Sequence, residues 1–222
     1  RQKNDAILFN HEKKKHMYVN GGSLKMKAIE EYVRSIPDFP QPGIIFRDLT
    51  SVLQDADGLA LAIDSMNDLI KDLDVDVIAG AESRGFILGT PLAYKLHKPF
   101  VLIRKKGKLP CEVISQSYDL EYGSATIEMH KDSIKPGQKV VLVDDLLATG
   151  GTAQAAVKLI ERLGGEVVKV IFLMELEGLN GREKLAGCDV ASVIHYEGKT
   201  IGKILQQCLS AGTVLIRGKV KN

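Results

Sequence analysis

The sequence predicts a single α/β domain built around a doubly wound parallel sheet, and three observations carry this prediction. Apolar runs at residues 75–80, 100–103, 140–143 and 167–174 have the continuous hydrophobicity of strands that are buried on both faces. Amphipathic helical patterns alternate with these runs along the chain. Residues 139–176 place a strand, a helix and a second strand at the spacing of a right-handed βαβ unit.

The first part of the chain changes character several times. Residues 1–25 are polar and irregular, so we expect a disordered or expression-derived leader, with a functional basic tail as the alternative. Residues 27–36 have apolar positions at helical spacing and predict a helix that Pro37 ends. The proline-rich stretch 37–53 predicts an extended, turn-rich segment, and residues 59–70 predict the next helix.

The remaining elements follow in alternation. A helix is predicted at residues 86–96, after the first buried strand, and the strand at 100–103 ends in a cluster of charges. Residues 104–124 form a long polar stretch, which is typical of a mobile functional loop or an excursion hairpin. The apolar stripe over residues 153–163 predicts a helix that Gly164 and Gly165 end.

The composition is that of an ordinary folded protein. Hydrophobic residues make up 45% and charged residues 26% of the 222 residues, which excludes a largely disordered chain. Lys and Arg total 30 against 28 Asp and Glu, so the formal net charge of +2 supplies no general basic field for nucleic acid. A phosphate group, if one is bound, must therefore be bound locally.

Other features indicate a reducing, cytoplasmic location. No apolar run approaches the roughly 18–20 residues of a membrane span, and the first 22 residues lack the apolar core of a signal peptide. The three cysteines, Cys111, Cys188 and Cys208, have no CxxC spacing, so we expect neither a disulfide framework nor a zinc knuckle. Nothing in the sequence supports a redox role for Cys111.

A candidate anion site follows the strand at 140–143. Asp144 and Asp145 lead through Leu146 into the run ATGGT at 148–152, where a helix begins. Glycines permit a tight turn, and backbone N–H groups at a helix N-terminus bind phosphate. The two carboxylates would repel a phosphate but suit a ligand's hydroxyl groups, so the pattern describes a ribose 5-phosphate site. Walker and dinucleotide-binding spacings are absent, and a strand cap with a plain tight turn is the alternative.

The segment VVLVDDLLATGGT resembles the phosphoribosyl-diphosphate motif of the type I phosphoribosyltransferase family. Four further segments, PDFPQPGIIFRDLT, IAGAESRGF, VLIRKKGKLP and YDLEYG, resemble the adenine-specific branch of that family. Their order along the chain makes the resemblance specific. It implies an α/β fold with a small hood and a mobile loop or hairpin over the active site, and a homodimer.

The resemblance also divides the chain. Residues 26–197 form the expected phosphoribosyltransferase domain, and residues 1–25 lie outside it as the leader. Residues 198–222 form a C-terminal extension of unknown role. Packing on the domain, extending a dimer interface and being a non-native tail all remain open for this extension.

The implied function is that of a pentosyltransferase of purine salvage, which converts adenine and 5-phospho-α-D-ribose 1-diphosphate to AMP and diphosphate. The C1–O bond breaks through an oxocarbenium-like state, so the departing diphosphate must be stabilised. Mg²⁺ is implied as a cofactor that arrives on the diphosphate and ribose with few or no direct protein ligands, and no His/Asp/Glu metal cluster occurs in the sequence. Neither nucleic acid nor a membrane is implied as a partner.

The resemblance gives each part of the substrate its own residues. The 5-phosphate is implied to bind Ala148, Thr149, Gly150, Gly151 and Thr152, and the ribose hydroxyls to bind Asp144 and Asp145. Phe46 and Leu146 would cover the two faces of adenine. Backbone groups of Ile45 and Arg47 would contact the ring edge, and a carbonyl there favours adenine because a 6-oxopurine lacks the exocyclic amine. A purely structural Phe46 in the core is the alternative.

Two cationic sites are implied for the diphosphate. Arg84 would neutralise the leaving group, with a surface ion pair as the alternative, and the family often has a cis peptide before this arginine, here Ser83–Arg84. The cations Arg104, Lys105, Lys106 and Lys108 form either a solvated charge run or a closing arm. In such an arm Arg104 reaches the neighbouring subunit's site and Lys108 contacts diphosphate.

The catalytic candidates are Arg84 and Glu121. Glu121 is implied to be the acid–base group that handles the purine imidazole proton, a contribution of about 10²–10⁴ in rate. Tyr122 would stack or hydrogen-bond over the closed site.

Two other functions remain as alternatives. A 6-oxopurine phosphoribosyltransferase has the same chemistry, but PGIIFRD and ESRGF resemble the adenine branch and no lysine closely follows the phosphate motif. A phosphoribosyl-binding regulator of DNA or RNA requires a DNA-binding extension or a basic face. The first 25 residues are too short for such a domain, and the net charge is nearly neutral.

Overall fold

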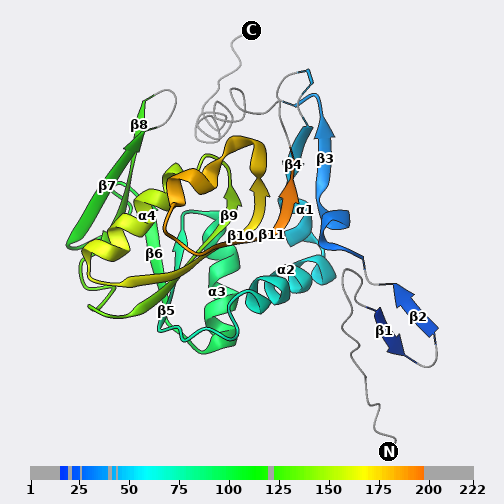
Figure 1. The fold of residues 1–222 in the computed structure, drawn as a ribbon, viewed down its shortest axis with the longest axis horizontal. Coiled ribbons are helices and arrows are strands. Elements are labelled where there is room, and N and C mark those ends of the chain that lie inside the picture. Colours follow the sequence, from blue (N-terminus) through cyan, green and yellow to red (C-terminus); the bar gives the residue numbers. More distant parts are fainter. Residues whose placement is uncertain are drawn as a thin grey trace, which may run out of the picture.

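A computed structural model describes residues 16–19, 22–25, 27–39, 42–43, 45–119 and 123–197 of the chain (Figure 1). Its centre is a seven-stranded sheet. From one edge to the other the strands are β11 (Val190–Tyr196), β10 (Glu166–Leu176), β9 (Lys139–Leu147), β5 (Val77–Ala81), β6 (Phe100–Lys105), β8 (Ser124–His130) and β7 (Val113–Asp119). The first five strands are parallel to one another, β8 is antiparallel to β6, and β7 is antiparallel to β8. The predicted α/β class is confirmed.

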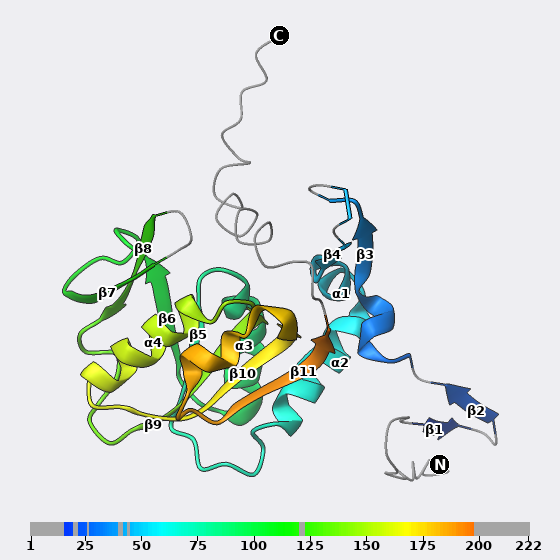
Figure 2. The ribbon, with the colours of Figure 1, turned by 45° about the horizontal axis from the view of Figure 1, so that its top comes forward.

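Helices cover both faces of the parallel strands, as a doubly wound sheet requires. Helices α2 (Ala56–Asp68) and α3 (Arg84–Leu96) pack with one set of buried strand side chains, and α4 (Gly151–Arg162) packs with the other. In Figures 1 and 2, α4 and the pair α2 and α3 lie on opposite sides of the sheet. Within the described residues, no helix is long and apolar enough to cross a membrane.

The βαβ unit β9–α4–β10 forms as the sequence predicts. Val140 to Val143 are at most 1% exposed, because β9 runs through the middle of the sheet with a helix layer on either side. The predicted apolar stripe of α4 is buried against the sheet, and Gly164 takes a positive φ of 86° where the chain leaves the helix. β9 extends four residues beyond the apolar run, to Leu147.

The prediction of one helix over residues 27–36 is wrong. The chain instead forms a 3₁₀ turn, η1 (Ile29–Tyr32), and then a strand, β3 (Arg34–Pro37), which pairs antiparallel with β4 (Ile45–Asp48). The reason lies in the helix α1 (Thr50–Gln54), which follows β4 and holds the chain at the start of β3 out of an α-helical conformation. The hydroxyl of Ser51 in α1 accepts from the backbone N–H of Arg34 at 2.9 Å and donates to the carbonyl of Tyr32 at 2.7 Å.

Two further hairpins complete the fold. Within the polar stretch at 104–124, residues 113–119 form β7, which pairs antiparallel with β8, so a hairpin accounts for this part of the stretch. Within the expected leader, β1 (His16–Val19) and β2 (Gly22–Lys25) pair with each other. The turns η2 (Glu177–Leu179) and η3 (Gly181–Leu185) connect β10 to β11.

Candidate active site

The candidate site lies where the neighbouring parallel strands β5 and β9 end. Their helices, α3 and α4, depart to opposite faces of the sheet. Such a divergence leaves a crevice at the carboxyl ends of the strands, where α/β proteins bind ligands. The motifs ESRG and DDLLATGGT follow these two strands, so the fold brings together segments that are some sixty residues apart.

The phosphate motif has the geometry of an anion-binding turn. Gly150 precedes α4 with φ 75° and ψ −1°, a left-handed conformation that favours glycine. Ala148, Gly150 and Gly151 are buried, whereas Thr149 and Thr152 are half-buried. The first backbone N–H groups of α4 have no partner within the helix, and together with the helix dipole they favour an anion.

Arg84 meets the phosphate motif through Asp145. The guanidinium Nε of Arg84, the first residue of α3, donates to Asp145 Oδ2 in a short ion pair. The neighbouring Gly85 explains this approach, because a Cβ there would lie 2.8 Å from the carbonyl oxygen of Val143. The Asp145 carboxylate is buried, while the Arg84 side chain remains 46% exposed.

The surroundings shift the pKa values of both Asp144 and Arg84. Burial, followed by the charge of Asp145, raises the pKa of Asp144 well above the usual aspartate value. Burial lowers the pKa of Arg84, but the carboxylates of Asp145, Asp144 and Asp48 outweigh this effect and raise it. The backbone N–H of Asp145 donates to Asp144 Oδ1 at 2.9 Å. A fixed cation therefore stands beside two carboxylates, one of which resists ionisation.

The loop after β5 contains a cis peptide bond between Glu82 and Ser83. The family resemblance implies a cis bond at Ser83–Arg84, whereas the structure has it one residue earlier, at Glu82–Ser83. From the sequence, Glu82 is expected to be a neighbour of the site and not a participant, because a lone glutamate in ESRG carries no pattern of its own.

Glu82 organises the cationic turn after β6. Arg104 Nε donates to Glu82 Oε2 at 3.1 Å, and the backbone N–H of Lys105 donates to the same oxygen at 3.1 Å. Although partial burial raises the pKa of Glu82, these hydrogen bonds lower it below the usual value. Arg104 Nη1 also donates to the Lys108 carbonyl at 3.2 Å. Within this chain, Arg104 thus holds the turn that carries Lys105 and Lys108.

The β7–β8 hairpin contacts the phosphate motif through Tyr118. The hydroxyl of Thr152 donates to the Tyr118 hydroxyl at 3.0 Å. Tyr118 was missed by sequence reasoning, which chose Tyr122 from the same YDLEYG segment. Strand alternation in β7 was the available signal, since its half-buried positions include residue 118. Glu121 and Tyr122 lie outside the described residues.

The proposed base-binding residues lie on the smaller β3–β4 sheet. Phe46 stacks edge-on against Phe39, with ring centroids 5.4 Å apart, and Ile45 is exposed. The guanidinium of Arg47 lies 4.3 Å from the ring centroid of Tyr196, which ties β4 to the end of β11. Figures 1 and 2 show β3 and β4 beside the β11 edge of the large sheet.

The remaining predicted residues are placed as follows. Leu146 is half-buried against the core on the α2 and α3 side of the sheet. Lys105, the last residue of β6, and Lys108, on the turn after it, are exposed. Among the described residues, no group of three His, Cys, Asp or Glu side chains is arranged to hold a metal ion. Among the described candidates, Arg84 and Asp145 form a direct ion pair, and Asp144 accepts from the backbone N–H of Asp145.

The chain matches known proteins over most of its length. The model of the phosphoribosyl transferase domain matches residues 49–201. The adenine phosphoribosyltransferase of Agathobacter rectalis is 69% identical over 174 residues, which cover 78% of this chain and 100% of that protein.

Solved structures agree with the sequence match. A crystal structure of adenine phosphoribosyltransferase from Thermoanaerobacter pseudethanolicus has a TM-score of 0.72 at 50% identity, covering 76% of this chain and 98% of that one. The Saccharomyces cerevisiae enzyme, crystallised with D-2,5-dideoxy-2,5-imino-altritol 1,6-bisphosphate and adenine, has a TM-score of 0.69 at 37% identity, covering 74% and 96%. With the loop geometry and the family match in agreement, the chain belongs to the adenine phosphoribosyltransferase family.

Proposed function

We propose that the chain transfers the phosphoribosyl group of 5-phospho-α-D-ribose 1-diphosphate to adenine, giving AMP and diphosphate. The observation that carries this proposal is the junction of the ATGGT turn with the Arg84–Asp145 pair at the diverging ends of β5 and β9. An anion-binding turn, two carboxylates and a cation match the phosphate, hydroxyl and diphosphate groups of that substrate. The names of the relatives support adenine as the acceptor.

The phosphorylated sugar would bind along the edge of β9. The backbone N–H groups of the ATGGT turn bind the 5-phosphate, and Asp144 and Asp145 accept from the ribose hydroxyls. The ion pair engages Nε of Arg84, and the side chain is 46% exposed, so its terminal N–H groups remain available for diphosphate. Lys108 approaches the same diphosphate from its exposed turn. These contacts stabilise the charge that develops as diphosphate leaves.

Adenine would lie between Phe46 and Leu146, with backbone groups of Ile45 and Arg47 at its edge. The β3–β4 sheet then serves as the hood, held to the main sheet by the contact of Arg47 with Tyr196. Adenine in the crystals of the yeast relative supports this choice of base. Glu121 handles the imidazole proton, and Tyr122 lies over the closed site.

Mg²⁺ fits the site as a substrate-bound ion. It prefers oxygen ligands and often binds through one or two carboxylates together with substrate phosphates. Asp144 and Asp145 supply oxygen at the ribose position, and Asp145 is already committed to Arg84. The ion would therefore be held mainly by substrate, where it neutralises the charge of the leaving diphosphate.

A homodimer and a cytoplasmic location belong to the same proposal. The outer face of α3 supports the dimer, because Ile87 is 47% and Tyr94 is 88% exposed and the two lie two helical turns apart on one side. Leu102 on the neighbouring β6 adds a further exposed apolar side chain. Exposed apolar groups that gather on one face are typical of subunit contacts.

The proposal is tested by turnover of the purified chain with adenine, phosphoribosyl diphosphate and Mg²⁺. We expect AMP to form in proportion to enzyme concentration. Glu121→Gln should lower kcat by about 10²–10⁴ while AMP binding persists. Tight binding of phosphoribosyl diphosphate without turnover would instead favour the phosphoribosyl-binding regulator.

A further inference from the structure

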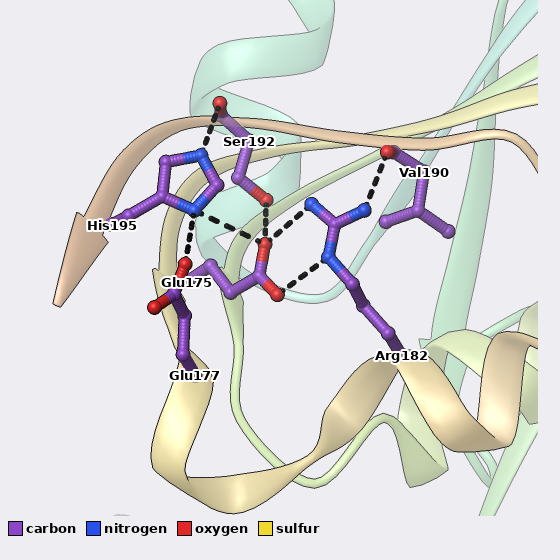
Figure 3. Close-up of polar contacts among 6 residues, drawn as sticks. All are labelled: Glu175, Glu177, Arg182, Val190, Ser192 and His195. Carbon is purple, nitrogen blue, oxygen red and sulfur yellow. Dashed lines mark hydrogen bonds and ion pairs between the residues drawn. The ribbon is translucent and has the colours of Figure 1, made fainter. Parts of the chain in front are cut away.

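A polar cluster surrounds the buried Glu175, among residues that the proposed reaction does not use (Figure 3). Arg182 in η3 donates from Nε and Nη2 to the two carboxylate oxygens of Glu175 in β10, each at 2.7 Å. Ser192 in β11 donates to Glu175 Oε2 at 2.8 Å, and Arg182 Nη1 donates to the Val190 carbonyl at 2.9 Å. Glu175 is only 3% exposed. We call this set of four residues the Arg182 clamp.

The clamp fixes a turn that is packed directly against the phosphate motif. A Cβ on Gly150 would overlap the carbonyl oxygen of Gly181, and a Cβ on Gly181 would overlap the carbonyl oxygen of Ala148. The two backbones are therefore in contact without side chains between them. Gln154 in α4 adds a hydrogen bond, donating from Nε2 to the Lys184 carbonyl at 2.9 Å. A displacement of η3 must consequently displace the phosphate motif.

The same turn carries a cation to the start of α4. The Lys184 ammonium lies 3.8 Å from the position that a Cβ on Gly151 would occupy, and Gly151 is the first residue of the helix. The Lys184 side chain is exposed and forms no ion pair within the described residues. An ammonium at this point adds a mobile charge to the fixed backbone donors of the turn.

We propose that Lys184 is a further phosphate-binding residue of this site, and that Arg182 is the positioning residue that places it there. The proposal rests on the proposed function, because it takes the anion to be the 5-phosphate of the sugar substrate. Lys184 contacts the phosphate itself. Arg182 acts through the backbone of η3, which it anchors to Glu175 and to β11.

Direct binding of ribose 5-phosphate, followed by calorimetry, tests the role of Lys184. This ligand needs the phosphate site and no turnover. Lys184→Met should raise its Kd about tenfold and raise KM for phosphoribosyl diphosphate similarly, with kcat and KM for adenine within about twofold. The matched control is Lys158→Met, an exposed lysine seven residues beyond the start of α4. An unchanged Kd in Lys184→Met, or an equal rise in both variants, overturns the proposal.

A double-mutant cycle tests the positioning role of Arg182. Arg182→Met should weaken ribose 5-phosphate binding at least as much as Lys184→Met does. In the double variant, the Lys184→Met substitution should raise the Kd by a smaller factor than it does in the wild-type chain. Arg182→Lys should restore part of the affinity. The control is Lys169→Met, which removes the Lys169–Asp189 ion pair (2.8 Å) between the opposite end of β10 and the segment before β11. This variant should bind ribose 5-phosphate with unchanged affinity. Fully additive effects of the two substitutions overturn the positioning role.

Both proposals are separable in one preparation. If the wild-type chain binds ribose 5-phosphate and the variants behave as described, but no AMP forms, the proposed function fails and the site assignment stands. If AMP forms and the affinity of Lys184→Met for ribose 5-phosphate is unchanged, the site assignment fails alone. If Arg182→Met does not fold, the ribose 5-phosphate affinities of Lys184→Met, at an exposed position, and of the conservative Arg182→Lys variant still test the two roles.

Discussion

Arg84 and Asp145 are 61 positions apart in the sequence and form an ion pair at the point where two neighbouring strands end. The pair depends on Gly85, which lets the first turn of α3 lie against the backbone of β9. The carboxylate is buried and the guanidinium is half-exposed, so the pair presents a cation at the carboxyl ends of β5 and β9. One close backbone contact thus connects the core to the proposed diphosphate site.

Gly85→Ala should disrupt this connection. The new Cβ would lie 2.8 Å from the Val143 carbonyl oxygen, a backbone atom that has little freedom to move. We expect stability to fall by about 1–3 kcal/mol and kcat/KM for phosphoribosyl diphosphate to fall at least tenfold. Gly89→Ala in the same helix is the control, because its Cβ would meet the side chain of Phe100 instead of the backbone of β9. Equal loss of kcat/KM in both variants would contradict this account.

Asp144→Asn should stabilise the folded chain at neutral pH. Burial raises the pKa of Asp144 in the folded state, so ionising this carboxyl costs more in the folded chain than in the unfolded chain. The wild-type chain therefore loses stability as pH rises from the ordinary aspartate pKa through the raised one. The amide removes the buried charge, and we expect a gain of about 0.5–2 kcal/mol at pH 7 that vanishes in acid. Activity should fall because the ribose hydroxyls lose a carboxylate. Urea denaturation at several pH values measures the effect, and a less stable variant at pH 7 would refute it.

Asp145→Asn provides the contrast to that prediction. Its carboxylate is the partner of Arg84, so removing the charge leaves the guanidinium without its ion pair. We expect this variant to be less stable than the wild type at pH 7 by about 1–3 kcal/mol. The neighbouring substitutions should therefore shift the denaturation midpoint in opposite directions.

Glu175 should contribute to stability in a pH-dependent way. Although partial burial raises the pKa of Glu175, hydrogen bonds from Arg182 and Ser192 lower it below the usual value. The contribution of Glu175 is therefore complete above about pH 4.3 and is lost as pH falls through the lowered pKa. Glu175→Gln should cost about 1–3 kcal/mol at pH 7, and much less in acid. Asp189→Asn, at an exposed ion pair, should change stability by less than about 1 kcal/mol at either pH.

Substitutions of Arg104 and Lys108 should have different effects, the first on thermal stability and the second on substrate binding. Arg104→Ala removes the two hydrogen bonds that the guanidinium donates to Glu82 and the one that it donates to the Lys108 carbonyl, so the Tm of the variant should fall by several degrees. Lys108→Ala removes an exposed side chain and should leave Tm unchanged while raising KM for phosphoribosyl diphosphate. Calorimetry and initial rates together measure both effects. A large loss of Tm in Lys108→Ala would show that its ammonium has a structural role.

The regular parts of the fold were predictable because their signals are local. The apolar run at 140–143 and the stripe of α4 each follow from the periodicity of one element. The strand β3 was predicted as a helix because residues 29, 33 and 36 have helical spacing. Its conformation depends instead on pairing with β4 and on Ser51, contacts that no local pattern encodes.

The site was predictable only where a motif specifies it. The ATGGT turn and its aspartates were identified from their order along the chain, and the structure adds the pairing of Asp145 with Arg84. The roles of Glu82, Tyr118 and Arg182 were not predicted because each depends on tertiary contacts with residues on other elements. A single glutamate, tyrosine or arginine in the sequence does not reveal such a contact.

The central claim is the choice of adenine, and one competition experiment tests it most directly. The purified chain is incubated with phosphoribosyl diphosphate, Mg²⁺ and equal concentrations of adenine, hypoxanthine, guanine and xanthine. Chromatography of the nucleotides then gives the ratio of kcat/KM values in one mixture. We predict AMP as the dominant product from the first time point. Formation of IMP, GMP or XMP in excess of AMP would contradict the account and indicate a 6-oxopurine enzyme on the same fold.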